Sequence, residues 1–254
     1  MFVPMKQPKA TLLVFIFFLL YACTPQPSAQ AIIDQAIAQH GGDKYESAVI
    51  EFDFRGRHYK AVRDQGLFSY ERLWTDSLGT VHDVLTNEGF TRTINNQPFE
   101  VSDEYARRYS NSVNGVIYFA LLPYHLNDPA VIKTYVGEAS VEGEPYHKIQ
   151  VTFREEKGGE DHEDVFVYWI HQATFRMDYL AYEFQEDGGG SRLRKAYHQR
   201  EVGGILFADY INYEGPYPAD TLANFDALYE QGKLKELSRI ELENVEVKPL
   251  SQDV

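Results

Sequence analysis

The chain has 254 residues, 44% of them hydrophobic and 14% aromatic, and its formal charge is −14 at pH 7. This length and apolar content suit one domain with a full core, or at most two small ones. The acidic charge excludes a protein that binds nucleic acid or anionic lipid through a basic surface. The single cysteine excludes an internal disulfide, so packing alone must stabilise the fold.

The N-terminus carries the pattern of an export signal. Lys6 and Lys9 precede an apolar run over 11–22, and Cys23 follows that run directly. The run is too short for a membrane-spanning helix, which needs about 20 apolar residues. We therefore predict that residues 1–22 are a signal peptide, that Cys23 is lipidated and that residues 23–30 form a Pro-rich tether. An ordinary secretory signal with a chance cysteine and a retained signal anchor are the alternatives.

The segment Leu20–Cys23 resembles the lipobox of bacterial lipoproteins, at which signal peptidase II cuts before the cysteine. That resemblance implies an N-terminus with three acyl chains, which would anchor stably, whereas a single chain holds only marginally. Thr24, not Asp, follows the cysteine. By resemblance to the Gram-negative sorting rule, this implies an outer-membrane lipoprotein that faces the periplasm in preference to the cell surface.

The next residues predict a helix followed by a series of strands. In 31–40, apolar side chains recur at helical spacing, and Gly41 ends the segment. The segment 50–55 alternates apolar and charged residues, which predicts a half-buried strand. Further strands joined by short turns are predicted at Phe68–Trp74, Val81–Leu85 and Phe90–Ile94.

The stretch 101–122 changes to an apolar spacing of four residues, which indicates one helix, or two helices broken near Gly115. The segment 164–170 is apolar on both faces, so it should be a central strand covered twice. A short helix is predicted at 222–229. In the last strand the apolar residues move from even to odd positions, which predicts a bulge at Asn244. The remaining predicted strands are 135–141, 146–153, 175–184, 193–198, 205–213 and 240–247.

This succession of strands in hairpin order predicts the fold class. The fold should be mainly β, a single strongly curved antiparallel sheet or half-barrel of about ten or eleven strands with helices on its concave side. Residues 31–248 should form this one domain, and residues 249–254 a C-terminal tail.

The same order of elements resembles the lipoprotein-carrier fold of the Lol pathway, in which an N-terminal helix precedes a curved antiparallel sheet. Several motifs also resemble an uncharacterised family of Gram-negative envelope lipoproteins. The residues that carry this second resemblance are Leu126–Val131, Asp161–Phe166, Trp169–Ile170, Met177–Tyr182 and Gly188–Gly190. These resemblances imply an envelope protein with a lipid or lipoprotein ligand, and they supply no catalytic residues.

The run Asp161–Asp164 is the most chemically suggestive one in the chain. Its acids and imidazole could hold a divalent cation, with Asp161, His162 and Asp164 as candidate ligands. On a strand only His162 and Asp164 share a side, so further ligands would have to come from elsewhere. A solvated strand end is the simpler interpretation, and no other cofactor is predicted.

The aromatic content favours sheet structure, and it also suits an apolar cavity. We expect the concave face to bind an acyl chain or a similar ligand. The predicted lining residues are Phe52, Phe54, Tyr70, Trp74, Tyr105 and Trp169. A fully packed core is the alternative for each of these residues taken singly.

The leading functional prediction is therefore an outer-membrane lipoprotein, not an enzyme, that binds an apolar ligand or partner in the envelope. Two alternatives come from other classes: a metal-dependent envelope hydrolase built on Asp161–Asp164, and a structural partner subunit. The eight histidines are scattered and form no HExxH motif, so zinc hydrolase chemistry has little support.

Overall fold

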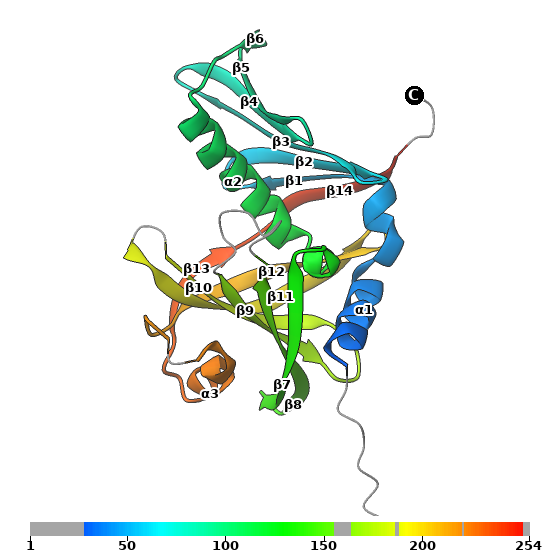
Figure 1. Cartoon of the computed structure of the whole chain (residues 1–254), viewed down its shortest axis with the longest axis vertical. Helices are drawn as coiled ribbons and strands as arrows, with labels where there is room; N and C mark the ends of the chain where they lie inside the picture. The colour runs from blue at the N-terminus through cyan, green and yellow to red at the C-terminus, as the bar shows by residue number, and fades with distance from the viewer. Residues whose placement is uncertain (1–27, 155–163, 186–187, 220, 251–254) are drawn as a thin grey trace, which may run out of the picture.

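The computed structural model describes residues 28–154, 164–185, 188–219 and 221–250. Within these residues the strands form two antiparallel sheets of seven strands each (Figure 1). The first sheet has the order β14-β1-β2-β3-β4-β5-β6, and the second has the order β13-β12-β11-β10-β9-β8-β7. Sequential neighbours therefore pair almost throughout, which confirms the mainly β fold in hairpin order.

The strands of the first sheet are β1 (Ala48–Phe54), β2 (Arg57–Asp64), β3 (Leu67–Asp76), β4 (Gly79–Thr86), β5 (Gly89–Ile94), β6 (Gln97–Pro98) and β14 (Glu243–Pro249). Those of the second sheet are β7 (Val131–Val141), β8 (Glu144–Phe153), β9 (Val165–His171), β10 (Met177–Phe184), β11 (Gly190–Val202), β12 (Ile205–Glu214) and β13 (Lys235–Ile240). The strands are thus more numerous than predicted, and they form two sheets instead of one.

The chain passes between the two sheets twice, between β6 and β7 and again at the link between β13 and β14. β13 and β14 follow one another along the chain and do not pair, so each joins the edge of a different sheet. The buried carboxylate of Asp209 lies at this break and accepts a hydrogen bond from the backbone N–H of Leu242 at 2.9 Å. Arg200 donates to the same carboxylate at 3.1 Å, so the backbone that leaves the ladder is still hydrogen-bonded.

The predicted bulge at Asn244 is confirmed. Glu51 pairs with Glu246 and Asp53 pairs with Glu243, so β14 carries one extra residue opposite β1. Asn244 has a φ of 51°, in the left-handed region that asparagine tolerates better than most residues.

The two longer helices pack mainly against different sheets. α1 (Ala29–His40) begins with Ser28, whose side chain accepts from the Ala31 N–H, and it buries Ile33 and Ala36 against the second sheet. α2 (Asp103–Ala120) lies along the first sheet and its C-terminal end reaches the second sheet (Figure 1). α2 runs through Gly115 unbroken, because Val113 and Ile117 are buried on either side of that residue.

The third helix does not share a face of the second sheet with α1. α3 (Phe225–Glu230) packs against the opposite face of the second sheet, where Phe225 contacts a cluster that includes Trp169. β9 is therefore covered on both faces, as its apolar sequence predicted. Phe166, Tyr168 and Ile170 face the α1 side, while the alternate residues face α3. The short 3-10 helices are η1 (Gly42–Ser47), η2 (Tyr124–Asn127) and η4 (Leu222–Asn224).

Candidate functional site

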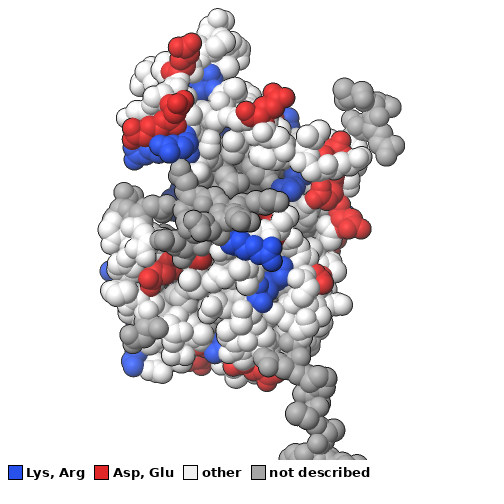
Figure 2. All heavy atoms as spheres, in the orientation of Figure 1, with Lys and Arg blue, Asp and Glu red and all other residues white. Residues whose placement is uncertain are grey.

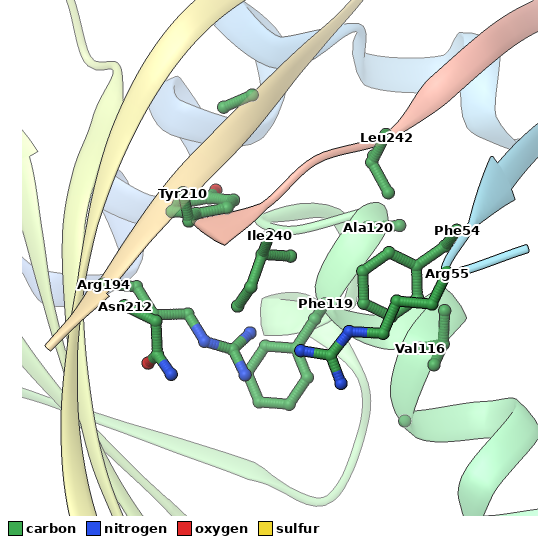
Figure 3. A pocket seen from close by; sticks show the side chains of 12 residues that line it. Phe54, Arg55, Val116, Phe119, Ala120, Arg194, Tyr210, Asn212, Ile240 and Leu242 are labelled. Atoms are coloured by element: carbon green, nitrogen blue, oxygen red, sulfur yellow. The ribbon is translucent and has the colours of Figure 1, made fainter. Parts of the chain in front are cut away.

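A cavity of about 220 Å³ lies where α2, the end of β1 and the β13–β14 link approach the second sheet. Figure 3 shows side chains from both sheets and from α2 directed toward this space. Its lining is mostly apolar, and the described residues of that lining include no Asp or Glu. The lining residues are Phe54, Arg55, Gly115, Val116, Phe119, Ala120, Arg194, Ala208, Tyr210, Asn212, Ile240 and Leu242.

One wall of the cavity is the C-terminal half of α2. Gly115, Val116 and Phe119 contribute to this wall because positions three and four apart share a helix face. Glycine costs about 0.5–1 kcal/mol relative to alanine inside a helix. A Cβ at Gly115 would meet no described atom within 4 Å, and the φ of Gly115 is not in the left-handed region. Packing in the described structure therefore does not demand glycine there, and its small size enlarges the cavity.

The opposite wall carries a row of polar side chains. Arg194 on β11 pairs in register with Asn212 on β12, which pairs with Ser238 on β13. Cross-strand partners project from the same face of a sheet. The Nδ2 of Asn212 donates to the Ser238 hydroxyl at 3.3 Å. Asn212 is only 8% exposed, and its Oδ1 is buried without a hydrogen-bond partner among the described residues.

Arg194 is the most unusual member of this row. Its Nη2 donates to the Tyr182 hydroxyl at 2.7 Å, and its guanidinium lies 4.0 Å from the centre of the Phe119 ring. Such a stacked arginine gains about 0.5–2 kcal/mol from the aromatic face. Its Nε is buried without an acceptor, and no carboxylate in the described part of the chain forms an ion pair with it.

A second guanidinium reaches the cavity from the first sheet. Arg55 follows β1 directly, with a φ of 50°, and lies 5.0 Å from the Phe54 ring. Figure 3 shows the guanidinium groups of Arg55 and Arg194 on either side of the Phe119 ring. Burial raises the pKa of Tyr210, so that this lining hydroxyl stays neutral. The two arginines are thus the charged groups of the lining.

The six predicted ligand-binding residues do not meet at one place. Phe54 lines the cavity, while Phe52 is fully buried in the core of the first sheet. Trp169 is fully buried on the α3 side of the second sheet, away from the cavity. Tyr105, near the start of α2, is 50% exposed.

The other two predicted residues border separate hollows along α2. The Tyr70 hydroxyl accepts from Arg63 Nη1 at 2.6 Å beside a polar hollow that also includes His125. The Trp74 ring has Arg57 at 4.9 Å and borders a third hollow near the N-terminal half of α2. The prediction that these residues bind a ligand is untested for all six.

The predicted metal ligands are only partly placed. Asp161 and His162 lie outside the described residues, and so does Cys23. Asp164 comes directly before β9, beside a surface pocket that Glu183 also lines. Within the described ranges no three His, Cys, Asp or Glu side chains are grouped so that they could hold a metal ion.

Sequence reasoning missed the residues that give the cavity its character, namely Gly115, Arg194 and Asn212. Two signals could have found them. A glycine inside an otherwise regular helical pattern indicates a packing or functional reason. Arg194 shares a face of β11 with Ala196, which packs against the core on the α1 side, so the period of two residues could have indicated that Arg194 points toward that side.

No helix in the described ranges is both long and apolar enough to span a bilayer. Comparison with curated proteins gives no match. Among solved structures, the chain is similar to a DUF1329 family protein from Desulfovibrio piger, with 14% identity and a TM-score of 0.47 over 86% of this chain and 92% of that one. It is also similar to a LolA superfamily protein from Nitrosomonas europaea, with 9% identity and a TM-score of 0.47 over 89% of this chain and 95% of that one.

At the level of sequence, the family DUF6503, described as a family of unknown function, matches residues 9–242. Because that match covers most of the chain, the protein belongs to the DUF6503 family.

Proposed function

We propose that the protein is an envelope lipoprotein that binds an apolar, lipid-like ligand in the cavity beside α2. The observation that supports this most directly is the lining, in which Val116, Phe119, Ile240 and Leu242 face a space that Gly115 leaves open. Apolar side chains around such a space favour an apolar ligand, because binding removes apolar surface from water. The volume of about 220 Å³ is below the roughly 300–1,000 Å³ of pockets for drug-sized ligands, which suits a narrow ligand such as one acyl chain.

The ligand is tested by filling the cavity from α2. Gly115→Leu is expected to weaken binding of N-phenyl-1-naphthylamine, a neutral apolar fluorophore, by at least about tenfold, because its side chain occupies the space of the ligand. Gly115→Ala is the matched control. It should retain the fluorophore and raise the free energy of unfolding by about 0.5–1 kcal/mol, because alanine favours the helix.

Fluorescence titration measures the first effect and urea unfolding measures the second. Native mass spectrometry of the unaltered protein, purified from membranes, should detect copurified lipid that Gly115→Leu lacks. Equal fluorophore binding by the two variants would contradict the proposal.

The second part of the proposal concerns the anchor. Cys23 is the lipidated residue, the Pro-rich residues after it tether the domain, and the outer membrane is the site of anchoring on its periplasmic side. The support is the position of this cysteine, the single one in the chain, directly after the apolar run.

Cys23→Ser is expected to abolish incorporation of labelled palmitate and to move the protein from the membrane pellet to the soluble envelope fraction. Both follow because no acyl chain can then be attached to that side chain. Labelling of cells with an alkyne-tagged palmitate, followed by fractionation, measures both effects. Palmitate label that persists in Cys23→Ser would refute the proposed anchor and would leave the proposal of ligand binding in the cavity unaffected.

A further inference from the structure

The cavity lining differs in charge from the rest of the molecule. The chain has a formal charge of −14, and Figure 2 shows acidic side chains spread among basic ones over the visible face. The described residues of the lining include two arginines and no carboxylate. Arg194 is half-buried and Arg55 is exposed, so the described lining presents positive charge that an anion entering the cavity would compensate.

Three other described arginines do have carboxylate partners. Arg72 and Arg92 share the carboxylate of Asp83, and Arg200 pairs with Asp209 at 3.1 Å. Arg194 has the Tyr182 hydroxyl and the Phe119 ring, and its Nε remains without an acceptor within the described residues. The structure thus leaves guanidinium donors directed at the cavity.

Asn212 adds a buried hydrogen-bond acceptor without a donor in the described structure. It stands beside Arg194 in the register of β11 and β12, it is only 8% exposed, and its Oδ1 finds no donor in the described structure. A buried polar atom without a partner costs about 1–3 kcal/mol. A hydroxyl or amide N–H next to an acid group would satisfy Asn212 while the acid group satisfies Arg194.

We infer that the ligand is an anionic amphiphile whose carboxylate or phosphate is held by Arg194 and Arg55. Its chain lies along Gly115 and Phe119 of α2. This inference rests on the proposed function, because the chain must occupy the same cavity. A guanidinium matches a carboxylate or a phosphate with two parallel hydrogen bonds, which an alcohol cannot accept. A cationic amphiphile would be repelled by both arginines.

The test compares amphiphiles that share a twelve-carbon chain and differ in the head, all below the concentrations at which they form micelles. Dodecanoate, dodecyl phosphate, dodecanol and dodecyltrimethylammonium are titrated against bound N-phenyl-1-naphthylamine. Dodecanoate or dodecyl phosphate should displace the fluorophore at least about tenfold more tightly than dodecanol, because hydrogen bonds to a charged group contribute more than neutral ones. Dodecyltrimethylammonium should be the weakest. The tighter of the two acids distinguishes a free fatty acid from a phosphate-headed lipid.

Arg194→Met should bring the acid down to the affinity of dodecanol and leave dodecanol unchanged, while Arg194→Lys should restore part of the preference. Arg192→Met is the matched control, because Arg192 lies two residues away on β11, bonds to the Ser191 carbonyl and is outside the cavity lining. Equal affinity for acid and alcohol in the unaltered protein, or an equal loss of both in Arg194→Met, would overturn the inference alone. Failure of every amphiphile to displace the fluorophore would overturn the proposed function, and the inference with it.

Discussion

Replacing Asp83 by asparagine is expected to lower the free energy of unfolding by about 3–5 kcal/mol. Asp83 is fully buried on β4 and its carboxylate bonds two guanidinium groups. Arg72 Nη2 donates to it at 2.6 Å, and Arg92 Nε donates at 2.6 Å from the next strand. The amide of asparagine has nearly the same shape but no charge, so two largely buried cations would remain without compensation.

The matched control is Asp53→Asn on β1 of the same sheet. Asp53 also accepts two hydrogen bonds, from Asn244 at 2.7 Å and in a 2.8 Å contact with His58, but its side chain is 34% exposed. Solvent screens that site, so the expected loss is at most about 1 kcal/mol. Urea unfolding of both variants at pH 7 measures the difference. A loss for Asp83→Asn no greater than that for Asp53→Asn would contradict the assignment.

The strands that sequence reasoning predicted are those with large apolar residues at alternate positions. β1 and β9 belong to this kind, and β9 could be recognised as central because both of its faces are apolar. β2 was missed because its buried positions are Tyr59 and the small Ala61, among charged neighbours. β13 was missed because its Leu237 is 45% exposed, so no buried face alternates along it. Pairing with β12 forms that strand, and pairing is not visible in a local pattern.

The division into two sheets could not be predicted for a related reason. The shift of apolar positions at Asn244 indicated a bulge, and the bulge is present. A local shift does not reveal that the chain has just left one sheet for another. At that point the Leu242 N–H donates to Asp209, which is more than thirty residues away. A buried carboxylate that bonds a backbone N–H at a strand break is a tertiary feature.

The candidate site was predictable only in its general chemistry. The sequence predicted that both faces of β9 are covered, which the structure confirms, but alternation alone does not say which face borders a cavity. Of the predicted lining residues, Trp169 lies on the α3 side of the second sheet, whereas Phe54 lies at the cavity. The polar row could not be predicted, because it forms only through the register that places Asn212 opposite Arg194. Register follows from turns and bulges along several strands.

Lowering the pH from 7 to 4 is expected to destabilise the protein by about 3 kcal/mol through His40 alone. His40 is the last residue of α1 and is 4% exposed. Its Nδ1 lies 2.7 Å from the Ala36 carbonyl, to which it donates, and its Nε2 accepts from the Met177 N–H at 3.5 Å. Burial lowers its pKa from 6.5 to about 4, and the charge of Arg176 lowers the pKa further, against the effect of the Ala36 carbonyl.

The sign follows from which state binds the proton. The folded protein resists protonation of His40 until about pH 4, while the unfolded chain takes up the proton from about pH 6.5 downward. The stabilisation is therefore complete above pH 6.5 and is lost as the pH falls toward 4.

Carboxylates also titrate near pH 4, so the measurement is the difference in the free energy of unfolding by urea between the unaltered protein and His40→Gln at each pH. The carboxylate contributions cancel in this difference. The free energy of unfolding of the unaltered protein, relative to that of His40→Gln, should fall by about 3 kcal/mol between pH 7 and pH 4. The exposed His58 offers the control, because the difference for His58→Gln should change by less than about 1 kcal/mol. A difference that stays constant with pH would contradict the prediction, because His40 would then be protonated as readily in the folded protein as in the unfolded chain. The packing of α1 against β10 would in that case tolerate a charged imidazole.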